Sequence, residues 1–280
     1  MAMNEAALGR RLQAARLTAG LTQQALCQKA GLSYSTLTKI ERGAIKSPSV
    51  FTIQSITTSL GIGLDELLGG ASKMNKHRSK SGVSFVYFDI NGCLVRFFHR
   101  AFTKIAEDTG APADIIETTF WHYNDEVCRG KMSMDEFNRA YAKAVGVSML
   151  DWQKYYLEAV EPIKEMAPLL EWISKHYRLG LLTNIMPGFI EALQQKKMLP
   201  NVQYDVIVDS SQVKTIKPEP TIFRLATEKA GCPPNEILLV DDGRHNLMAA
   251  EKHGWHVLWF DDYRPEESIK RIKSSLVPAD

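Results

Sequence analysis

Apolar residues recur at two different spacings along the chain, and the change between them divides it. Over residues 5–68 the apolar positions follow helical spacing, as in Leu8, Leu12, Ala15 and Leu17, without an alternating strand pattern. After residue 82, short apolar runs rich in aromatic and β-branched residues alternate with helix-like stretches. This pattern predicts an all-α first domain and an α/β second domain whose parallel sheet is covered on both faces.

The predicted strands of the second domain share an apolar core and a polar end: SFVYFDI, LGLLTNI, YDVIVDS, EILLVDD and WHVLWFDD. Residues 97–165 are helical in pattern and lack strand signals, so we expect a helical insertion after the first strand. Residues 69–82, GGASKMNKHRSKSG, read as a flexible, solvated linker. The predicted domains are therefore 1–68 and 83–280.

Charge is distributed unevenly between these domains. The net charge is +2, but residues 1–80 carry 11 Lys and Arg against 4 Asp and Glu, which gives +7. The remainder carries 23 basic and 28 acidic residues, which gives −5. A basic end on an acidic body points to a polyanionic partner for the first domain.

The cysteines and the apolar runs of the sequence indicate the cellular compartment of the protein. Cys27, Cys93, Cys128 and Cys232 have no zinc or redox spacing, so we expect reduced, mostly buried thiols. The first residues lack the apolar core of a signal peptide, and no run approaches the roughly 18 apolar residues of a membrane span. We therefore expect a cytoplasmic protein without a membrane partner.

The segment Leu21–Gly43 has the arrangement of two short helices joined by a tight turn. A helix from Thr22 places Ala25, Leu26 and Ala30 inward, Gly31 suits a turn that needs positive φ, and a helix from Ser33 places Leu37 and Ile40 inward. The outer face of the second helix carries Tyr34, Ser35, Thr38 and Lys39, which can all form hydrogen bonds. Such a pair of helices reads DNA when this face is exposed, although a protein-interaction module has the same pattern.

Residues 5–68 resemble the phage-repressor and Cro-like helix-turn-helix family, through LTQQAL, GLSYSTLTKIERG and LGIGLDELL. The resemblance implies that Ser33–Arg42 enters the major groove of double-stranded DNA, that Gln23 contacts the backbone, and that Tyr34, Ser35 and Lys39 approach base edges. It implies a structural ion pair between Arg16 and Glu41. Members of this family commonly form dimers, because operators tend to be palindromic.

Four short signals follow in the second domain: FVYFDINGCL with Asp89, LLTN with Thr183 and Asn184, KPEPTIF with Lys217, and LLVDDGRHN with Asp241 and Asp242. Three of them lie at ends of predicted strands, where parallel sheets bind ligands. Three carboxylates suit Mg²⁺, while Lys217 and the Thr183 hydroxyl suit a phosphate. Asp89 is placed to act as a nucleophile.

Together these signals resemble the haloacid dehalogenase superfamily, and specifically the capped branch that includes the phosphatase domain of soluble epoxide hydrolase. The resemblance implies a Rossmann-like domain whose cap spans about residues 97–165. It implies that Asp89 is the nucleophile, that Thr183, Asn184 and Lys217 hold phosphate, and that Asp89, Asp241, Asp242 and the main-chain carbonyl of Asn91 hold Mg²⁺. Trp121, His122 and Arg129 in the cap either face substrate or are ordinary core and surface residues.

One position departs from the family. Family phosphatases place an aspartate two residues after the nucleophile as general acid and base, and this chain has Asn91 there. Loss of such a group typically costs about 10²–10⁴-fold in rate. His99 and His122 are the conceivable substitutes.

Three functions remain open on these grounds. We expect a dimeric DNA-binding transcriptional regulator whose second domain senses phosphate or a phosphorylated small molecule with Mg²⁺. The alternatives are a Mg²⁺-dependent phosphatase tethered to a DNA-binding domain, and a second domain used only for dimerisation.

Overall fold

The computed structural model describes residues 5–45, 47–60, 62, 67 and 78–278 of the chain. It divides into two compact units, Met1–Asn75 and Lys76–Asp280. The boundary lies inside the expected linker, 69–82, of which 69–77 are outside the described residues.

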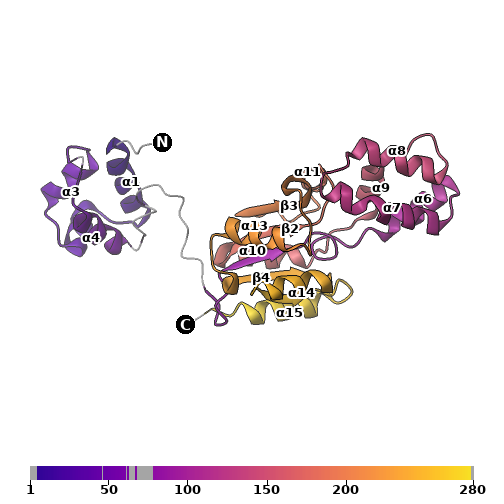
Figure 1. Cartoon of the computed structure of the whole chain (residues 1–280). Helices are drawn as coiled ribbons and strands as arrows, with labels where there is room; N and C mark the ends of the chain where they lie inside the picture. Colours follow the sequence, from indigo (N-terminus) through magenta and orange to yellow (C-terminus); the bar gives the residue numbers. More distant parts are fainter. Residues whose placement is uncertain (1–4, 46, 61, 63–66, 68–77, 279–280) are drawn as a thin grey trace. The chain divides into compact units, whose positions relative to one another are not determined.

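The first unit is helical throughout its described part (Figure 1), with α1 (Glu5–Thr18), α2 (Gln23–Ala30), α3 (Tyr34–Glu41) and α4 (Val50–Leu60). The Thr22 and Ser33 side chains cap α2 and α3 by accepting hydrogen bonds from backbone N–H groups, so these residues precede the helices rather than begin them. Gly31 ends α2 at φ +65°, as the tight turn requires.

A small apolar core holds the first unit together. Leu12, Leu26 and Leu37 are fully buried, and Leu8 is nearly so. Leu17 belongs to α1 as the spacing predicted, but it is 63% exposed because it lies five residues after Leu12 and so points away from the buried side of the helix. Of the segment LGIGLDELL, only Leu60, Ile62 and Leu67 lie inside the described residues.

The second unit contains a parallel five-stranded sheet in the order β3-β2-β1-β4-β5. Its strands are β1 (Phe85–Phe88), β2 (Arg178–Thr183), β3 (Val206–Asp209), β4 (Ile237–Asp241) and β5 (His256–Trp259). This is the expected Rossmann-like α/β architecture. Each strand falls within the predicted apolar run or within one residue of it.

Helices cover both faces of this sheet (Figure 1). One core contains residues of α10 (Met166–His176), α11 (Phe189–Gln195) and α15 (Pro265–Ser275), and the other contains residues of α13 (Pro220–Ala230) and α14 (Arg244–Lys252). The short α12 (Ser210–Val213) and a single 3₁₀ turn (Pro234–Glu236) complete the unit. Successive residues of β1 enter opposite cores, Phe85 and Tyr87 one of them and Val86 and Phe88 the other, which explains why the strand is apolar throughout.

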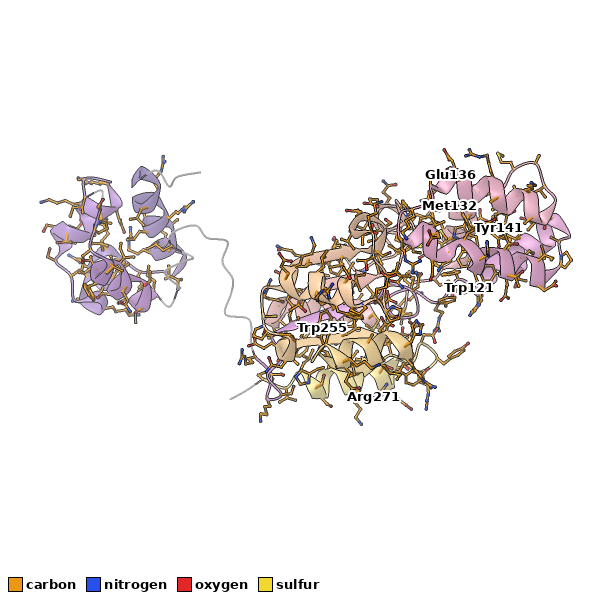
Figure 2. All side chains as sticks on the ribbon, in the orientation of Figure 1. Trp121, Met132, Glu136, Tyr141, Trp255 and Arg271 are labelled. Carbon is orange, nitrogen blue, oxygen red and sulfur yellow. The ribbon has the colours of Figure 1, made fainter. Side chains whose placement is uncertain are left out.

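A helical cap is inserted between β1 and α10. It consists of α6 (His99–Thr109), α7 (Ala113–Cys128), α8 (Met134–Val145) and α9 (Trp152–Ala159), which gather at one end of the sheet (Figure 1). Its interior is aromatic, with ring centroids of Phe120 and Trp152 only 4.5 Å apart. Tyr141, labelled in Figure 2, ties α8 to α7 by donating a hydrogen bond to the carbonyl of Ile116 at 3.0 Å.

Some expectations for the remaining residues need correction. Residues 78–82 of the expected linker pack on the second unit: Arg78 pairs with Glu236, Ser79 is 2% exposed, and Lys80 N–H donates to the carbonyl of Val277.

The four cysteines are free, as expected, with three buried and Cys232 half-buried. No helix among the described residues is long and apolar enough to span a membrane.

Candidate functional site

Adjacent strands deliver polar side chains to one end of the sheet. Asp89 directly follows β1, while Thr183 ends β2 and Asp241 ends β4, the two neighbours of β1. Carboxyl ends of parallel strands share one edge, so the three side chains meet there. All three are buried, with Asp89 the most accessible at 7%.

The carboxylates form a compact cluster. Asp89, Asp241 and Asp242 each place an oxygen within 4.8 Å of the others. Asp242 rests against the backbone at Gly92, where φ is +80° and an added Cβ would lie 2.2 Å from Asp242 Oδ2. Glycine is therefore needed there for both conformation and space. Three hard oxygen donors at this spacing fit a divalent cation such as Mg²⁺.

Lys217 places a positively charged ammonium group beside these carboxylates. Its Nζ lies 2.5 Å from Asp241 Oδ2 and 3.1 Å from Asp89 Oδ1, and the residue is 1% exposed. Although burial alone lowers the pKa of Lys217, the two carboxylates raise it above its usual value, so the amine stays charged. One ammonium group faces three carboxylates, which leaves excess negative charge.

This excess is visible in the pKa values of the carboxyl groups. Burial raises the pKa of Asp89 to about 6, with Lys217 opposing the change and Asp241 adding to it. Burial, and then repulsion from Asp89 and Asp241, raises the pKa of Asp242 to about 7. A bound divalent cation would relieve both, because it favours the ionised form.

Asp241 is anchored by protein donors. Its Oδ1 accepts hydrogen bonds from the Gly243 N–H at 2.7 Å and from Asn246 Nδ2 at 3.0 Å, while Lys217 bonds to Oδ2. These bonds fix the carboxylate at the centre of the cluster. Asn246 had no signal in the sequence beyond its position in the DDGRHN run.

Thr183 and Asn184 have different roles. Thr183 Oγ1 is completely buried and forms no hydrogen bond of ordinary geometry with the described residues, although it lies near enough to Asp89 to lower the pKa of that carboxyl group. A buried hydroxyl whose hydrogen-bonding capacity is not fully used is available to a ligand, so Thr183 is a candidate ligand contact. The Asn184 side chain donates to the carbonyl of Lys217 at 2.8 Å and accepts its N–H at 2.7 Å, and its expected contact with phosphate stays a prediction. Its side chain positions Lys217.

Asn91 is engaged by the cap. Its Oδ1 accepts a hydrogen bond from the Tyr156 hydroxyl of α9 at 2.7 Å. Tyr156 is 1% exposed, and burial raises the pKa of its phenol well above the usual value. Neither the amide nor this phenol exchanges a proton near neutral pH. Nothing in the segment QKYYLEAV marked Tyr156 beforehand.

The cap residues named from the sequence lie in different places. Trp121 (labelled in Figure 2) and His99 line a cavity of about 570 Å³ together with Asp242. His122 is exposed, and its ring lies edge-on to Tyr123. Arg129 forms an ion pair with Glu219 at 2.8 Å, which joins α7 to the start of α13. In the structure, Arg129 thus connects the cap to the body of the domain.

In the first unit, the outer face of α3 carries the expected residues. Ser33, Tyr34, Ser35 and Lys39 are exposed, whereas Thr38 is half-buried and its hydroxyl donates to the carbonyl of Tyr34. Tyr34 also donates from its hydroxyl to Gln23 Oε1 at 2.9 Å.

This face connects to a buried ion pair. Gln23 Nε2 donates to Glu41 Oε2 at 2.7 Å, and Arg16 Nε donates to Glu41 Oε1 at 2.7 Å. The ion pair expected between Arg16 and Glu41 is confirmed. The buried Arg16–Glu41 pair therefore holds the Gln23 side chain in place, and Gln23 in turn accepts the hydrogen bond of Tyr34.

Two family models match the chain. A helix-turn-helix family matches residues 12–67, and the haloacid dehalogenase-like hydrolase family matches residues 84–254. The second match covers more than half of the chain, and the two together correspond to the two domain types expected.

Curated relatives match about half of the chain or somewhat more. A phosphorylated carbohydrates phosphatase of Thermotoga maritima is 26% identical over 186 residues, covering 60% of this chain and 81% of that protein. Acyl-CoA dehydrogenase family member 10 of Mus musculus is 27% identical over 146 residues, 51% of this chain. Bifunctional epoxide hydrolase 2 of Rattus norvegicus is 24% identical over 147 residues, 46% of this chain. This chain spans only 14% of the mouse protein and 26% of the rat protein.

Solved structures share the fold. A predicted HAD-like family hydrolase from Porphyromonas gingivalis matches with a TM-score of 0.58 at 24% identity, covering 68% of this chain and 98% of that one. A HAD family enzyme of Bacteroides thetaiotaomicron, solved as a variant with magnesium and inorganic phosphate, matches with a TM-score of 0.55 at 20% identity, covering 64% and 94%. At these identities the likeness extends to the fold alone.

Proposed function

Since this chain belongs to the haloacid dehalogenase-like hydrolases and carries a helix-turn-helix domain, we propose that it is a DNA-binding regulator whose second domain binds phosphate or a phosphorylated small molecule with Mg²⁺. The basic excess of residues 1–80 supports DNA binding, because neutralising phosphates supplies most nonspecific affinity. A dimer on a palindromic operator is part of the proposal.

In this proposal Mg²⁺ is held by Asp89, Asp241, Asp242 and the main-chain carbonyl of Asn91. The cation supplies charge neutralisation for the phosphoryl group. The unbalanced carboxylates, two of them buried and Asp242 half-buried, support this assignment, because they repel one another without a cation.

The phosphoryl group is held by Lys217 and Thr183. Lys217 offers a buried charge, and Thr183 offers a buried hydroxyl beside Asp89. Asn184 keeps Lys217 in place from its backbone side.

The observation that carries the proposal is that Asn91 occupies the position of the acid–base aspartate. An amide cannot donate or remove a proton, and its oxygen is already bonded to the buried Tyr156 phenol. His122, one of the conceivable substitute acids, is an exposed residue of the cap, and His99 lines the outer cavity rather than the space beside Asn91. A site with binding groups but without an acid–base group is suited to retain its ligand.

A slow phosphatase is the second candidate, favoured by the intact pair of Asp89 and Lys217 and by the similarity to a phosphatase of Thermotoga maritima. A domain used only for dimerisation would not need three carboxylates and a buried lysine gathered at the ends of its strands.

The test combines two measurements on the full chain. Thermal unfolding is followed with Mg²⁺ alone, then with Mg²⁺ plus a phosphometabolite panel. A ligand at 100 times its Kd adds about 2.7 kcal/mol of stability. DNA binding to genomic fragments is then measured with and without the best ligand. Stabilisation that requires Mg²⁺ and changes DNA affinity supports the regulator. The proposal fails if no phosphoryl compound stabilises the protein.

A further inference from the structure

We infer that Arg129 of the cap is a positioning residue for Lys217, and that it acts through Glu219 to set where the ammonium group lies in the site. The inference rests on the proposed function, in which Lys217 holds the phosphoryl group. It adds that the hold on this group depends on the contact between the cap and Glu219.

Glu219 connects the cap to the segment that carries Lys217. Its Oε1 accepts a hydrogen bond from Arg129 Nε at 2.9 Å, and its Oε2 accepts one from the Thr215 hydroxyl at 2.6 Å. The bond from Thr215, and after it the bond from Arg129, hold the pKa of Glu219 below its usual value, although burial opposes them. Glu219 is therefore ionised near neutral pH and bonds to both sides at once.

The turn that contains Lys217 is held from two directions. The Glu219 N–H donates to the carbonyl of Ile216 at 2.9 Å, which closes the turn. Asn184, which directly follows β2, bonds to both backbone groups of Lys217, at 2.7 Å and 2.8 Å. The Lys217 side chain leaves this turn to place Nζ 3.1 Å from Asp89 Oδ1, so a shift of the turn changes that distance.

The end of the cap that carries Arg129 rests on the body of the domain through contacts of its own. Ser210 Oγ donates to the carbonyl of Cys128 at 2.7 Å, and Lys214 Nζ donates to the carbonyl of Gly130 at 3.1 Å. These bonds flank Arg129 on both sides in the sequence. They therefore fix where its side chain meets Glu219.

The contact between Arg129 and Glu219 can break without leaving the guanidinium group bare. Arg129 Nη1 also donates to Glu126 at 3.2 Å, and Nη2 lies 3.7 Å from an Asp125 oxygen, both on α7. The side chains of Arg129 and Glu219 are 19% and 35% exposed, so solvent screens the pair and its removal should cost the fold little. We therefore expect its loss to be felt at Lys217 more than in stability.

The direct readout is the NMR signal of the methylene group next to Lys217 Nζ, in the full chain with carbon-13-labelled lysine. Lys217→Met identifies this signal by removing it. We expect Arg129→Gln to shift the signal, whereas Arg139→Gln, which removes the same charge from the exposed face of α8, should leave it in place. An unshifted signal in Arg129→Gln would overturn the inference.

A double-mutant cycle tests whether Arg129 acts through Glu219. Isothermal titration of inorganic phosphate in Mg²⁺ should show about tenfold weaker binding in Arg129→Gln and in Glu219→Gln, and no further loss in the double variant. Losses that add up in the double variant would contradict this path. Thermal unfolding should find Arg129→Gln as stable as Arg139→Gln. If Arg129→Gln does not fold, Glu219→Gln takes its place in the NMR comparison.

The inference and the proposed function can fail separately. If phosphate binds to Arg129→Gln as tightly as to the native chain, the inference is wrong and the proposed function stands. If no phosphoryl compound binds to the native chain with Mg²⁺, the proposed function fails, while the shift of the Lys217 signal still decides whether Arg129 positions this residue.

Discussion

Each unit of this protein contains a buried cluster of charges, and the two clusters differ in balance. In the first unit, Arg16 and Glu41 form a pair with one charge of each sign, and their side chains are 7% and 3% exposed. In the second unit, Lys217 faces the three carboxylates of Asp89, Asp241 and Asp242.

The difference separates a structural ion pair from a ligand site. The hydrogen bond to Glu41 raises the pKa of Arg16, so Arg16 keeps its charge in the balanced pair without any further ligand. In the second cluster the pKa values of Asp89 and Asp242 move toward neutrality, so the cluster is relieved only by protons or by a cation. All three pKa values are raised, but a raised pKa favours the charged form of Arg16 and the neutral form of Asp89 and Asp242. The form that is favoured thus distinguishes an ion pair that stabilises the fold from a cluster prepared for a cation.

The largest expected effect comes from completing the chemistry of the unbalanced cluster. Asn91→Asp introduces a carboxyl group that can give and take a proton beside Asp89. Attack of Asp89 on bound inorganic phosphate, with loss of water, then becomes reversible. Exchange of oxygen-18 from labelled phosphate into water, measured by ³¹P NMR, should accelerate by about 10²–10⁴-fold.

The double variant Asn91→Asp with Asp89→Asn is the control and should show no exchange. Exchange that is equally fast in the native protein would mean that the site already has an acid–base group.

Breaking the balanced pair should destabilise the first unit. Arg16→Met leaves Glu41 buried with Gln23 as its remaining donor, which costs about 3 kcal/mol of unfolding free energy by the rule for broken buried pairs. Chemical denaturation measures the loss, and Mg²⁺ should not restore it. The double variant Arg16→Met with Glu41→Met should recover much of it.

The variant Lys217→Met provides the comparison in the second unit. There Mg²⁺ should restore part of the lost stability. If Mg²⁺ acted equally on the two variants, the two clusters would not differ as a structural pair and a cation site.

The pH dependence of stability should expose the unbalanced cluster. Asp89 and Asp242 have folded pKa values of about 6 and about 7, above the ordinary 3.8, so between pH 4 and 7 the folded state binds more protons than the unfolded state. Stability without metal should therefore fall as pH rises through this window, by about 1–3 kcal/mol. Mg²⁺ should cancel the fall, since it binds the ionised form. Asp242→Asn should flatten the metal-free curve; an unchanged slope would contradict these pKa values.

The smallest expected effects lie on the exposed face of the first unit. Lys39→Ala should weaken binding to DNA fragments and lower the salt slope of the binding constant by about one phosphate contact. Gln23→Ala should weaken binding and leave the slope unchanged, because its amide carries no charge. Fluorescence anisotropy at several salt concentrations distinguishes them. Glu228→Ala on α13 of the second unit is the neutral control, and equal losses in all three variants would argue against α3 as the DNA surface.

The sequence predicted those features that depend on local pattern. Strand periodicity located the sheet, and polar residues at strand ends located Asp89, Thr183 and Asp241, because parallel topology brings such ends together. Thr22 and Ser33 were found near helix starts because capping requires a side chain of that type.

Features that depend on contacts across the fold were not predictable in this way. Tyr156 bonds to Asn91 across 65 residues of sequence, and no motif distinguishes it from its neighbour Tyr155. Asn184 was assigned to phosphate because its position suggested the site, whereas the amide bonds to the backbone of Lys217. Arg129 was considered for substrate because its charge is visible in sequence, while its partner Glu219 lies 90 residues away.

The central claim, that this site binds a phosphoryl group without turning it over, is tested most directly by phosphate release. The native full chain is incubated with Mg²⁺ and a panel of sugar phosphates, and inorganic phosphate is followed over time beside Asp89→Asn. The account predicts no release above that of Asp89→Asn. Brisk release from any sugar phosphate by the native protein, lost in Asp89→Asn, would contradict it and establish a phosphatase.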